Sequence, residues 1–514
     1  MRKRRLIALA CVLAVLCAAV ALSLADAVSR GPILSKEQLN QAGMKIGVST
    51  GSASMLIAEK ELPNAEIVYY NDTASAYEAV AQGKLDAYVY DRRQMELAIS
   101  SGRSGVRLLD ENMDETVPIA VGISPVTKIP DFTERLNAFI RELKNDGTLD
   151  GMFQRWAVDQ NEQMPVIPST ADPQIHLTVA TSGVVPPFSY YKGADLNGYD
   201  IELAYRFAAW LGADVTFKVY DYTGIVPAAI SGDVDCIMAN LNITDERRES
   251  LPFSDVLYTE QVGIMVADTA AAASGSFWDS FRESFTKTFI RESRWQLFLQ
   301  GILNTLIITV LSVLCGTLLG FGVFMLCRNG NPVSNAVTRF VTWLVQGMPM
   351  VVLLMILYYI VFGNVSISGI LVSVIGFTLT FASSVFSLLK LGVGTVDRGQ
   401  YEAAYALGYP NRRTFFRAIL PQALPHILPA WKGEIVNLIK ATAIVGYIAV
   451  QDLTKMADIV RSRTFEAFFP LIAITVIYFI LEELIGLLIS RISININPKR
   501  RSPESILKGV KTDD

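Results

Sequence analysis

Residues 398–431 read RGQYEAAYALGYPNRRTFFRAILPQALPHILPAW and lie between two long apolar segments. The stretch contains four arginines, Arg398, Arg412, Arg413 and Arg417. A basic loop between apolar segments is typical of the cytoplasmic side of a multispanning membrane protein. This stretch therefore indicates a membrane domain and sets its orientation.

Within the loop, six residues follow the spacing EAA-x3-G-x10-I-x-P: Glu402, Ala403, Ala404, Gly408, Ile419 and Pro421. The pattern resembles the EAA loop of ABC importer permeases, a cytoplasmic helix pair that seats in a groove of the ATPase subunit. The resemblance implies that these residues couple the chain to a cytosolic ABC ATPase. It also implies that ATP is bound by that partner and that this chain carries no cofactor of its own.

Composition supports a chain with a soluble part and a membrane part. The 514 residues are 51% hydrophobic, and the mean hydropathy is +0.35. The net charge of −4 gives no reason to expect a nucleic-acid partner. Two histidines, His176 and His426, and five scattered cysteines indicate neither a metal site nor a disulfide framework. The sequence contains no G-x-x-x-x-G-K-[ST] and no Ser/His/Asp or Cys/His constellation, so we expect a transport subunit rather than an enzyme.

The N-terminus has the pattern of an export signal. MRKRR precedes an apolar run, and Ala25-Asp26-Ala27 forms an A-x-A cleavage pattern. Residues 1–27 are either a signal peptide or an uncleaved membrane anchor. Both interpretations place the following residues outside the cytoplasm.

Five apolar segments are long enough to cross a bilayer core of about 30 Å, at about 300–326, 338–362, 367–390, 428–450 and 468–490. Arginine and lysine concentrate in the loops 327–339, 390–417 and 494–511. The positive-inside rule therefore places the EAA loop (398–421) and the tail (494–514) in the cytoplasm. Five crossings by the domain 299–493 then leave residues 28–298 outside, in agreement with the export signal. We expect a multi-pass protein of the bacterial cell membrane, in contact with lipid.

Two features inside the spans are candidates for the transport pathway. Gly347 and Pro349 interrupt the second span in a Q-G-M-P sequence that resembles the R-G-T-P signature of polar amino-acid permeases, with two departures. Such a break is tolerated where it lines a cavity. Glu434 and Lys440 lie in the fourth span, where charges usually face a bundle interior. They either line the pathway or form an intrahelical structural pair.

The exported part shows α/β patterning in two blocks, 28–158 and 175–268, joined by the Pro-rich linker 159–174. Residues 269–298 contain a second linker and then phenylalanines at every fourth position, from Phe277 to Phe289. This repeat predicts a helix on the outer membrane surface, with packing on the soluble domain as the alternative.

The second block resembles the first lobe (lobe 1) of type II solute-binding proteins for polar amino acids, through PPF at 186–188, GYDIELA at 198–204 and SGDVDCIMANLNITDER at 231–247. The first block resembles the second lobe (lobe 2), through MKIGVSTGSA, GKLDAYVYD and VPIAVGIS, and it ends as the family's C-terminal helices do. The order is the reverse of the family's. We infer one circularly permuted binding domain. The alternatives are two degenerate half-domains or lobes exchanged between protomers.

The resemblance also implies a site. Arg247, after Thr244, matches the arginine that clamps the ligand carboxylate, and Ser52, after Gly51, matches a hydroxyl that donates to the same group. Asp91 matches the carboxylate that receives the ammonium. Three further residues complete the set of candidates, namely the cleft aromatics Phe188 and Tyr222 and the substituted position Asn242. Asp200 and Glu202 are expected to be structural or rim charges.

The sequence thus predicts a multi-domain chain, with an α/β bilobed type II periplasmic-binding-protein-like domain and an all-α ABC importer transmembrane domain of about five spans. Its predicted function is ATP-driven import of polar amino acids, as a homodimer carrying two binding domains. The alternative function is an amino-acid-gated channel or a membrane sensor. The EAA loop would have no purpose in that alternative.

Overall fold

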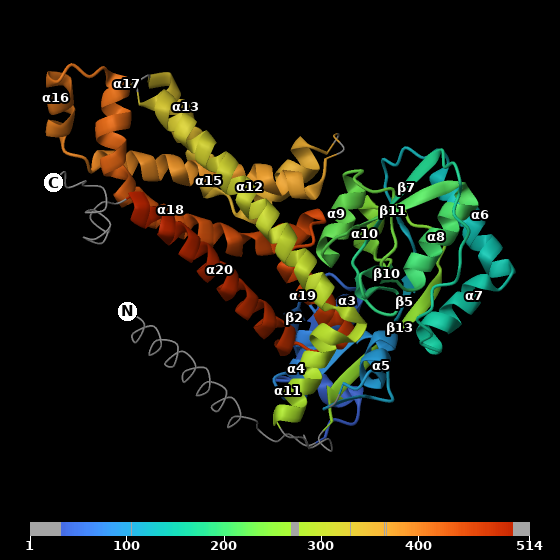
Figure 1. Cartoon of the computed structure of the whole chain (residues 1–514). Helices are drawn as coiled ribbons and strands as arrows, with labels where there is room; N and C mark the ends of the chain where they lie inside the picture. The colour runs from blue at the N-terminus through green and yellow to red at the C-terminus, as the bar shows by residue number, and fades with distance from the viewer. Residues whose placement is uncertain are drawn as a thin grey trace.

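The computed structural model describes residues 32–496, except 104, 269–276, 329, 331, 364 and 366 (Figure 1). The predicted signal or anchor and most of the predicted tail lie outside these residues. The described part consists of two α/β lobes beside an elongated helical domain. This arrangement confirms the predicted fold class.

Lobe 2 comprises residues 32–119 and 258–268. Its sheet has the order β2-β1-β3-β13-β4, with β5 also paired to β13. β1 runs parallel to β2 and β3, whereas β13 is antiparallel to β3, β4 and β5. The strands are β1 (Lys45–Ser49), β2 (Glu66–Tyr70), β3 (Ala87–Asp91), β4 (Val106–Leu108), β5 (Thr116–Ile119) and β13 (Tyr258–Ala267). The helices are α2 (Lys36–Leu39), α3 (Ala53–Glu61), α4 (Thr73–Ala81) and α5 (Arg92–Ser100).

Lobe 1 comprises residues 122–257. Its sheet has the order β11-β7-β12-β6, and a separate antiparallel sheet has the order β10-β9-β8. The strands are β6 (Gly122–Ile123), β7 (Ile175–Thr181), β8 (Val184–Val185), β9 (Ser189–Lys192), β10 (Asp195–Asn197), β11 (Ala213–Val219) and β12 (Cys236–Ile237). The helices are α6 (Phe132–Asn145), α7 (Thr148–Phe153), α8 (Tyr199–Leu211), α9 (Ile225–Ile230) and α10 (Asp245–Ser250).

The boundary between the lobes differs from the predicted one. Helices α6 and α7 were predicted with the first block, but their apolar faces pack in the core of lobe 1, where the rings of Phe139 and Phe207 lie 5.2 Å apart. Hydrogen bonds also join the segment after α7 to α8: the buried Glu202 of α8 accepts from Arg155 at 2.7 Å and from Trp156 at 2.6 Å. Strand β13 was predicted with the second block, but it pairs with β3 of lobe 2. The chain therefore crosses between the lobes twice, near residues 120 and 257, and completes the main sheet of each lobe by itself.

The helical domain follows the lobes. Three helices are long and apolar enough to cross a membrane, and the number rises to five if each of two bent pairs counts as one span. The bends measure 108° between α13 and α14 and 59° between the α18 segment and α19. The helices are α11 (Phe277–Phe285), α12 (Trp295–Cys327), α13 (Pro332–Gly347), α14 (Met350–Met355), α15 (Gly369–Gly394), α16 (Arg398–Ala406), α17 (Asn411–Thr414), α18 (Leu420–Ala441), α19 (Leu453–Thr464) and α20 (Phe468–Ile496).

Small residues let α12 and α15 approach closely. A Cβ built on Gly320 of α12 would lie 2.5 Å from the carbonyl oxygen of Ala382 and 2.9 Å from the Cβ of Val385, both on α15. Such close backbone packing is a common way to join helices in a membrane. Gly322, two residues further along α12, has no heavy atom within 4 Å of a built Cβ.

The helix predicted from the phenylalanine repeat is present: α11 (Phe277–Phe285) continues as a π-helical turn over Thr286–Ile290, and a short 3-10 turn follows over Arg291–Ser293. The ring of Phe281 lies 5.3 Å from that of Phe469 at the start of α20, and Phe289 lies 4.9 Å from Phe298 of α12. The aromatic repeat therefore packs, at least in part, on the ends of the membrane helices.

Candidate functional site

Arg247 lies at the boundary between the lobes. Thr244 caps α10, because its hydroxyl accepts the backbone N–H of Arg247 at 3.2 Å. The guanidinium donates from Nη1 to the carbonyl of Asn242 in lobe 1 and from Nη2 to the carbonyl of Gly51 in lobe 2, both at 2.8 Å. Its Cζ lies 6.0 Å from the ring centroid of Tyr222. The predicted carboxylate clamp thus joins the two lobes.

The opposite wall of the cleft is the start of α3. Gly51 has φ +75°, a left-handed conformation that favours glycine, and turns the chain from β1 into the helix. Ser52 caps α3 by accepting the N–H of Met55 at 3.3 Å. A helix N-terminus with a hydroxyl is a favourable place for a carboxylate. Gly51 and Ser52 therefore form the part of the lobe 2 wall that Arg247 reaches through the carbonyl of Gly51.

Asp91 ends β3 and is buried. Its Oδ2 accepts hydrogen bonds from Gln94 Nε2 at 3.1 Å and from Asn240 Nδ2 at 2.8 Å. Asn240 belongs to lobe 1, so this is a second polar contact between the lobes. Burial raises the pKa of Asp91 above its ordinary value, and the two amide donors partly oppose that rise. An ammonium group would satisfy this carboxylate better than neutral amides do.

Asn240 also connects Asp91 to a second buried acid. Its backbone N–H donates to Asp200 Oδ2 at 2.6 Å, and Tyr258 donates to its side-chain oxygen at 2.7 Å. Burial raises the pKa of Asp200 to about 7. Burial and the nearby Asp91 also raise the pKa of Glu260. Two further buried acids, Asp200 and Glu260, thus lie near Asp91, the predicted ammonium site.

Two predicted cleft residues are buried rather than exposed to the cleft. Phe188 packs in the core of lobe 1, with its ring 5.5 Å from that of Tyr258 and 6.3 Å from that of Tyr199. Asn242 is also buried, and its Nδ2 has no hydrogen-bond partner among the described residues.

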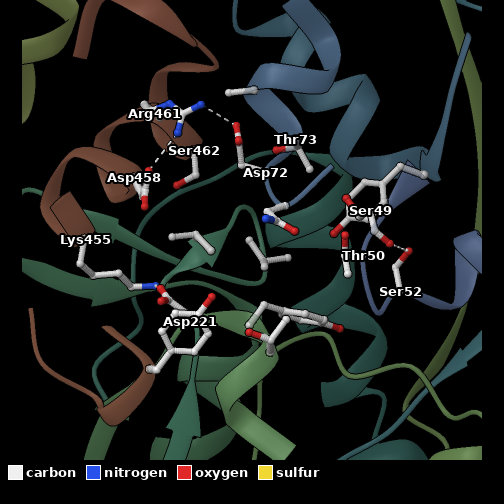
Figure 2. A pocket seen from close by; sticks show the side chains of 18 of the residues that line it. Ser49, Thr50, Ser52, Asp72, Thr73, Asp221, Lys455, Asp458, Arg461 and Ser462 are labelled. Carbon is white, nitrogen blue, oxygen red and sulfur yellow. Dashed lines mark hydrogen bonds and ion pairs between the residues drawn. The ribbon is translucent and has the colours of Figure 1, made fainter. Parts of the chain in front are cut away.

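A cavity of about 460 Å³ opens from the cleft toward the helical domain (Figure 2). Of the predicted residues, Ser52 and Tyr222 line it. Its wall comes from three parts of the chain: lobe 2, lobe 1 and the segment from Ala443 to Ser462. The charged side chains in the wall are Asp72, Asp221, Lys455, Asp458 and Arg461. The cleft therefore continues as a polar chamber that reaches the helical domain.

The sequence prediction missed these five charged residues. Lys455, Asp458 and Arg461 repeat every three residues on α19, and Asp452 caps that helix by accepting the N–H groups of Thr454 and Lys455. This spacing of charges after an Asp is a recognisable helix signal. The sequence analysis predicted no element in this segment, which lies between the predicted spans 428–450 and 468–490.

The predicted ATPase-coupling residues form a separate feature at the far end of the helical domain (Figure 1). Glu402 and Ala403 are exposed on α16, whereas Ala404 is buried. Gly408 has φ +77° and turns the chain toward α17, and Pro421 lies in the first turn of α18. Two short helices with an exposed face therefore project from the end opposite the lobes.

The predicted pathway residues are only partly brought together. Gly347 and Pro349 lie at the 108° bend between α13 and α14. Glu434 lines a cavity of about 130 Å³. Lys440 forms an ion pair with Glu482 of α20 at 3.2 Å. The described residues contain no group of His, Cys, Asp and Glu side chains suited to a metal.

Comparisons with known proteins agree with this architecture. The family "Bacterial extracellular solute-binding proteins, family 3" matches residues 177–424, a range that begins in β7. The putative glutamine transport system permease protein GlnP of Rickettsia typhi is 34% identical over 193 residues, which cover 37% of this chain and 87% of the relative. The arginine transport system permease protein ArtQ of Bacillus subtilis is 33% identical over 193 residues, covering 36% of this chain and 84% of the relative.

A solved structure, described as an amino acid ABC transporter with histidines, is 28% identical, with a TM-score of 0.37, and covers 43% of this chain and 99% of that one. The permease relatives match over most of their own length. The chain accordingly belongs to the family of amino-acid ABC transporter permeases, and it carries a solute-binding domain fused to the permease.

Proposed function

We propose that this chain is the membrane subunit of an ATP-driven importer of polar amino acids and that its lobes deliver the solute to its own helical domain. The observation that carries the proposal is the chamber of about 460 Å³, whose wall includes both lobes and the helical domain. A solute released from the cleft would enter the helical domain without crossing bulk water.

The α-amino acid class follows from the two groups at the lobe boundary. Arg247 offers a planar guanidinium that donates to two carbonyls, and a ligand carboxylate would replace these contacts with charge-assisted bonds. Asp91, on the other lobe, offers a buried carboxylate for an ammonium. Ligand bridging these groups favours the closed lobes over the open ones.

The solute side chain is proposed to be uncharged or basic. Three carboxylates, Asp72, Asp221 and Asp458, line the chamber with only two cationic groups, Lys455 and Arg461. The chamber therefore offers no surplus positive charge to an acidic side chain. The names of the relatives mention glutamine and arginine, which fit this description.

Three further parts of the proposal concern organisation. The clamp is circularly permuted, with 159–174 leading from the helices α6 and α7 to β7 inside the same lobe. The exposed face of α16, with Glu402, seats on a cytosolic ATPase that binds ATP. Two copies form the importer, because the described residues of one copy supply at most five spans, and the pathway needs two membrane subunits.

Uptake into proteoliposomes tests the function. The chain is reconstituted with its ATPase and internal ATP, and radiolabelled amino acids are supplied outside. We expect accumulation against the gradient that depends on ATP and is lost in Glu402→Arg. Amino-acid flux that runs only down its concentration gradient and does not depend on ATP would contradict active import and indicate a channel.

A further inference from the structure

Lobe 1 is joined to the helical domain over a broad surface. Tyr220, Ile225 and other buried residues of this lobe share one apolar core with residues of α12, α14 and α15. Polar contacts add to it: Tyr358 donates to Asp233 at 2.8 Å, and Lys455 contacts Asp221 at 2.6 Å. A core of this kind resists separation, because opening it would expose apolar surface to water.

Lobe 2 is joined to the helical domain at the far end of α19. At the start of α4, Arg461 Nη2 donates to Asp72 Oδ1 at 2.8 Å (Figure 2). The same nitrogen also donates to Ser75 Oγ at 2.6 Å. Four residues later, the buried Phe465 lies in the apolar core of lobe 2, with its ring 6.1 Å from that of Tyr77. These contacts involve few side chains of the helical domain.

Helix α19 therefore touches both lobes at once. Lys455, in its first turn, is fixed to lobe 1, and Arg461, in its last turn, is fixed to lobe 2. Both side chains are almost completely buried, at 3% and 8% exposure. The two contacts coexist here with the closed contact between Arg247 and Gly51. If the lobes rotate apart about the crossings near residues 120 and 257, the helix cannot keep both contacts.

We propose that lobe 1 is the fixed lobe, that lobe 2 is the moving lobe, and that Arg461 with Phe465 is the latch on which the moving lobe docks when it closes. The proposal rests on the proposed function only in taking an amino acid as the trigger. Phe465 has φ +54° and is separated from α20 by two residues, so the latch is connected directly to the last membrane helix. Docking of lobe 2 on α19 would thereby link closure of the lobes to the position of α20 in the permease.

Spin-label distances in the full chain in nanodiscs test the latch. The five cysteines are replaced by alanine, and labels are placed at the exposed positions Lys84 in lobe 2, Glu249 in lobe 1 and Gln296 at the start of α12. Double electron–electron resonance then gives the 84–296 and 249–296 distances. The probe is a mixture of the twenty proteinogenic amino acids, present or absent.

We expect a narrow 249–296 distribution in every condition. The 84–296 distribution should be narrow with amino acids and broader or longer without them. Arg461→Ala should broaden it in both conditions, and the exchange of Asp72→Arg with Arg461→Asp should restore it. Arg463→Ala is the matched control, because this arginine pairs with Glu162 and Glu292 outside lobe 2 and should leave both distances unchanged.

An 84–296 distance distribution that is unchanged by Arg461→Ala would overturn the latch. Equal broadening of the 84–296 and 249–296 distributions by Arg461→Ala would overturn it as well. If the amino acids have no effect but Arg461→Ala still broadens the 84–296 distance alone, the latch is supported and the proposed solute class is contradicted. The narrow 249–296 distance also shows that each variant remains folded.

Discussion

Arg247 of lobe 1 donates a hydrogen bond from Nη2 to the carbonyl oxygen of Gly51 of lobe 2 at 2.8 Å. The residue predicted to clamp a ligand carboxylate therefore already connects the two walls of the cleft. A bound carboxylate would compete for these donors and strengthen the same bridge, because bonds between charged groups are about twice as strong as neutral ones.

Replacing Arg247 with alanine should remove most of the amino-acid affinity. The lost charge-assisted bonds correspond to roughly a 10- to 100-fold rise in Kd. Arg248→Ala is the control, since Arg248 is the next residue on α10 and is exposed. Calorimetric titration gives the Kd of each variant. Equal Kd values for Arg247→Ala and Arg248→Ala would show that Arg247 is not part of the binding site.

Asp91→Asn should weaken binding while the fold is retained. The amide keeps an oxygen that accepts from Gln94 and Asn240, but it no longer offers a charge to the ammonium. We expect a Kd rise of roughly 10-fold or more. The unfolding temperature without ligand should stay near that of the parent chain, because burial of the ionised acid is costly. Unchanged affinity would refute the ammonium role.

Asp200 makes stability depend on pH. Its folded pKa of about 7 lies above its ordinary value of 3.8, so the folded state binds the proton more tightly than the unfolded state. Its contribution to stability is fully present below pH 3.8 and is lost as the pH rises to about 7. Asp200→Asn, which still accepts from the N–H of Asn240, should reduce the fall in unfolding temperature between pH 5 and pH 8. An identical fall in the variant and the parent would contradict this role.

Gly320→Ala should destabilise the helical domain. The new methyl group would meet the carbonyl of Ala382 at 2.5 Å, and overpacking of this kind typically costs about 1–3 kcal/mol. Gly322→Ala on the same helix has open space and should be neutral or stabilising, because alanine favours helix more than glycine does. Thermal unfolding in detergent compares the two, and a Gly320→Ala protein as stable as Gly322→Ala would show that α12 and α15 are not closely packed.

Glu402→Arg should abolish binding of the ATPase without changing amino-acid binding. Glu402 is exposed on α16, and the reversed charge would face the partner directly. Co-purification of the ATPase with the variant measures the effect. Glu246→Arg, an exposed glutamate on lobe 1, is the control and should retain the ATPase. Retention of the ATPase by Glu402→Arg would place the coupling surface elsewhere.

The sequence was most informative where local rules operate. The resemblance to the EAA loop predicted a helix pair around Gly408, and the AYVYD strand placed Asp91 at a strand end. The sequence was less informative where packing between distant segments decides which lobe an element joins or which residues pair. The apolar face of 132–158 fits either lobe by pattern alone, and only packing against Phe207 assigns it to lobe 1. Arg461 and Asp72 are 389 residues apart, so no local pattern connects them. Phe188 shows the same limit, because an aromatic residue in a motif can belong to a core.

Calorimetric titration of the purified full chain in nanodiscs against each of the twenty amino acids tests whether the two lobes form an amino-acid clamp. We predict tight binding of a polar, uncharged or basic amino acid, with one site per chain, which is lost in Arg247→Ala and preserved in Arg248→Ala. A folded chain that binds none of the twenty, or binds one equally well without Arg247, would contradict the proposed clamp.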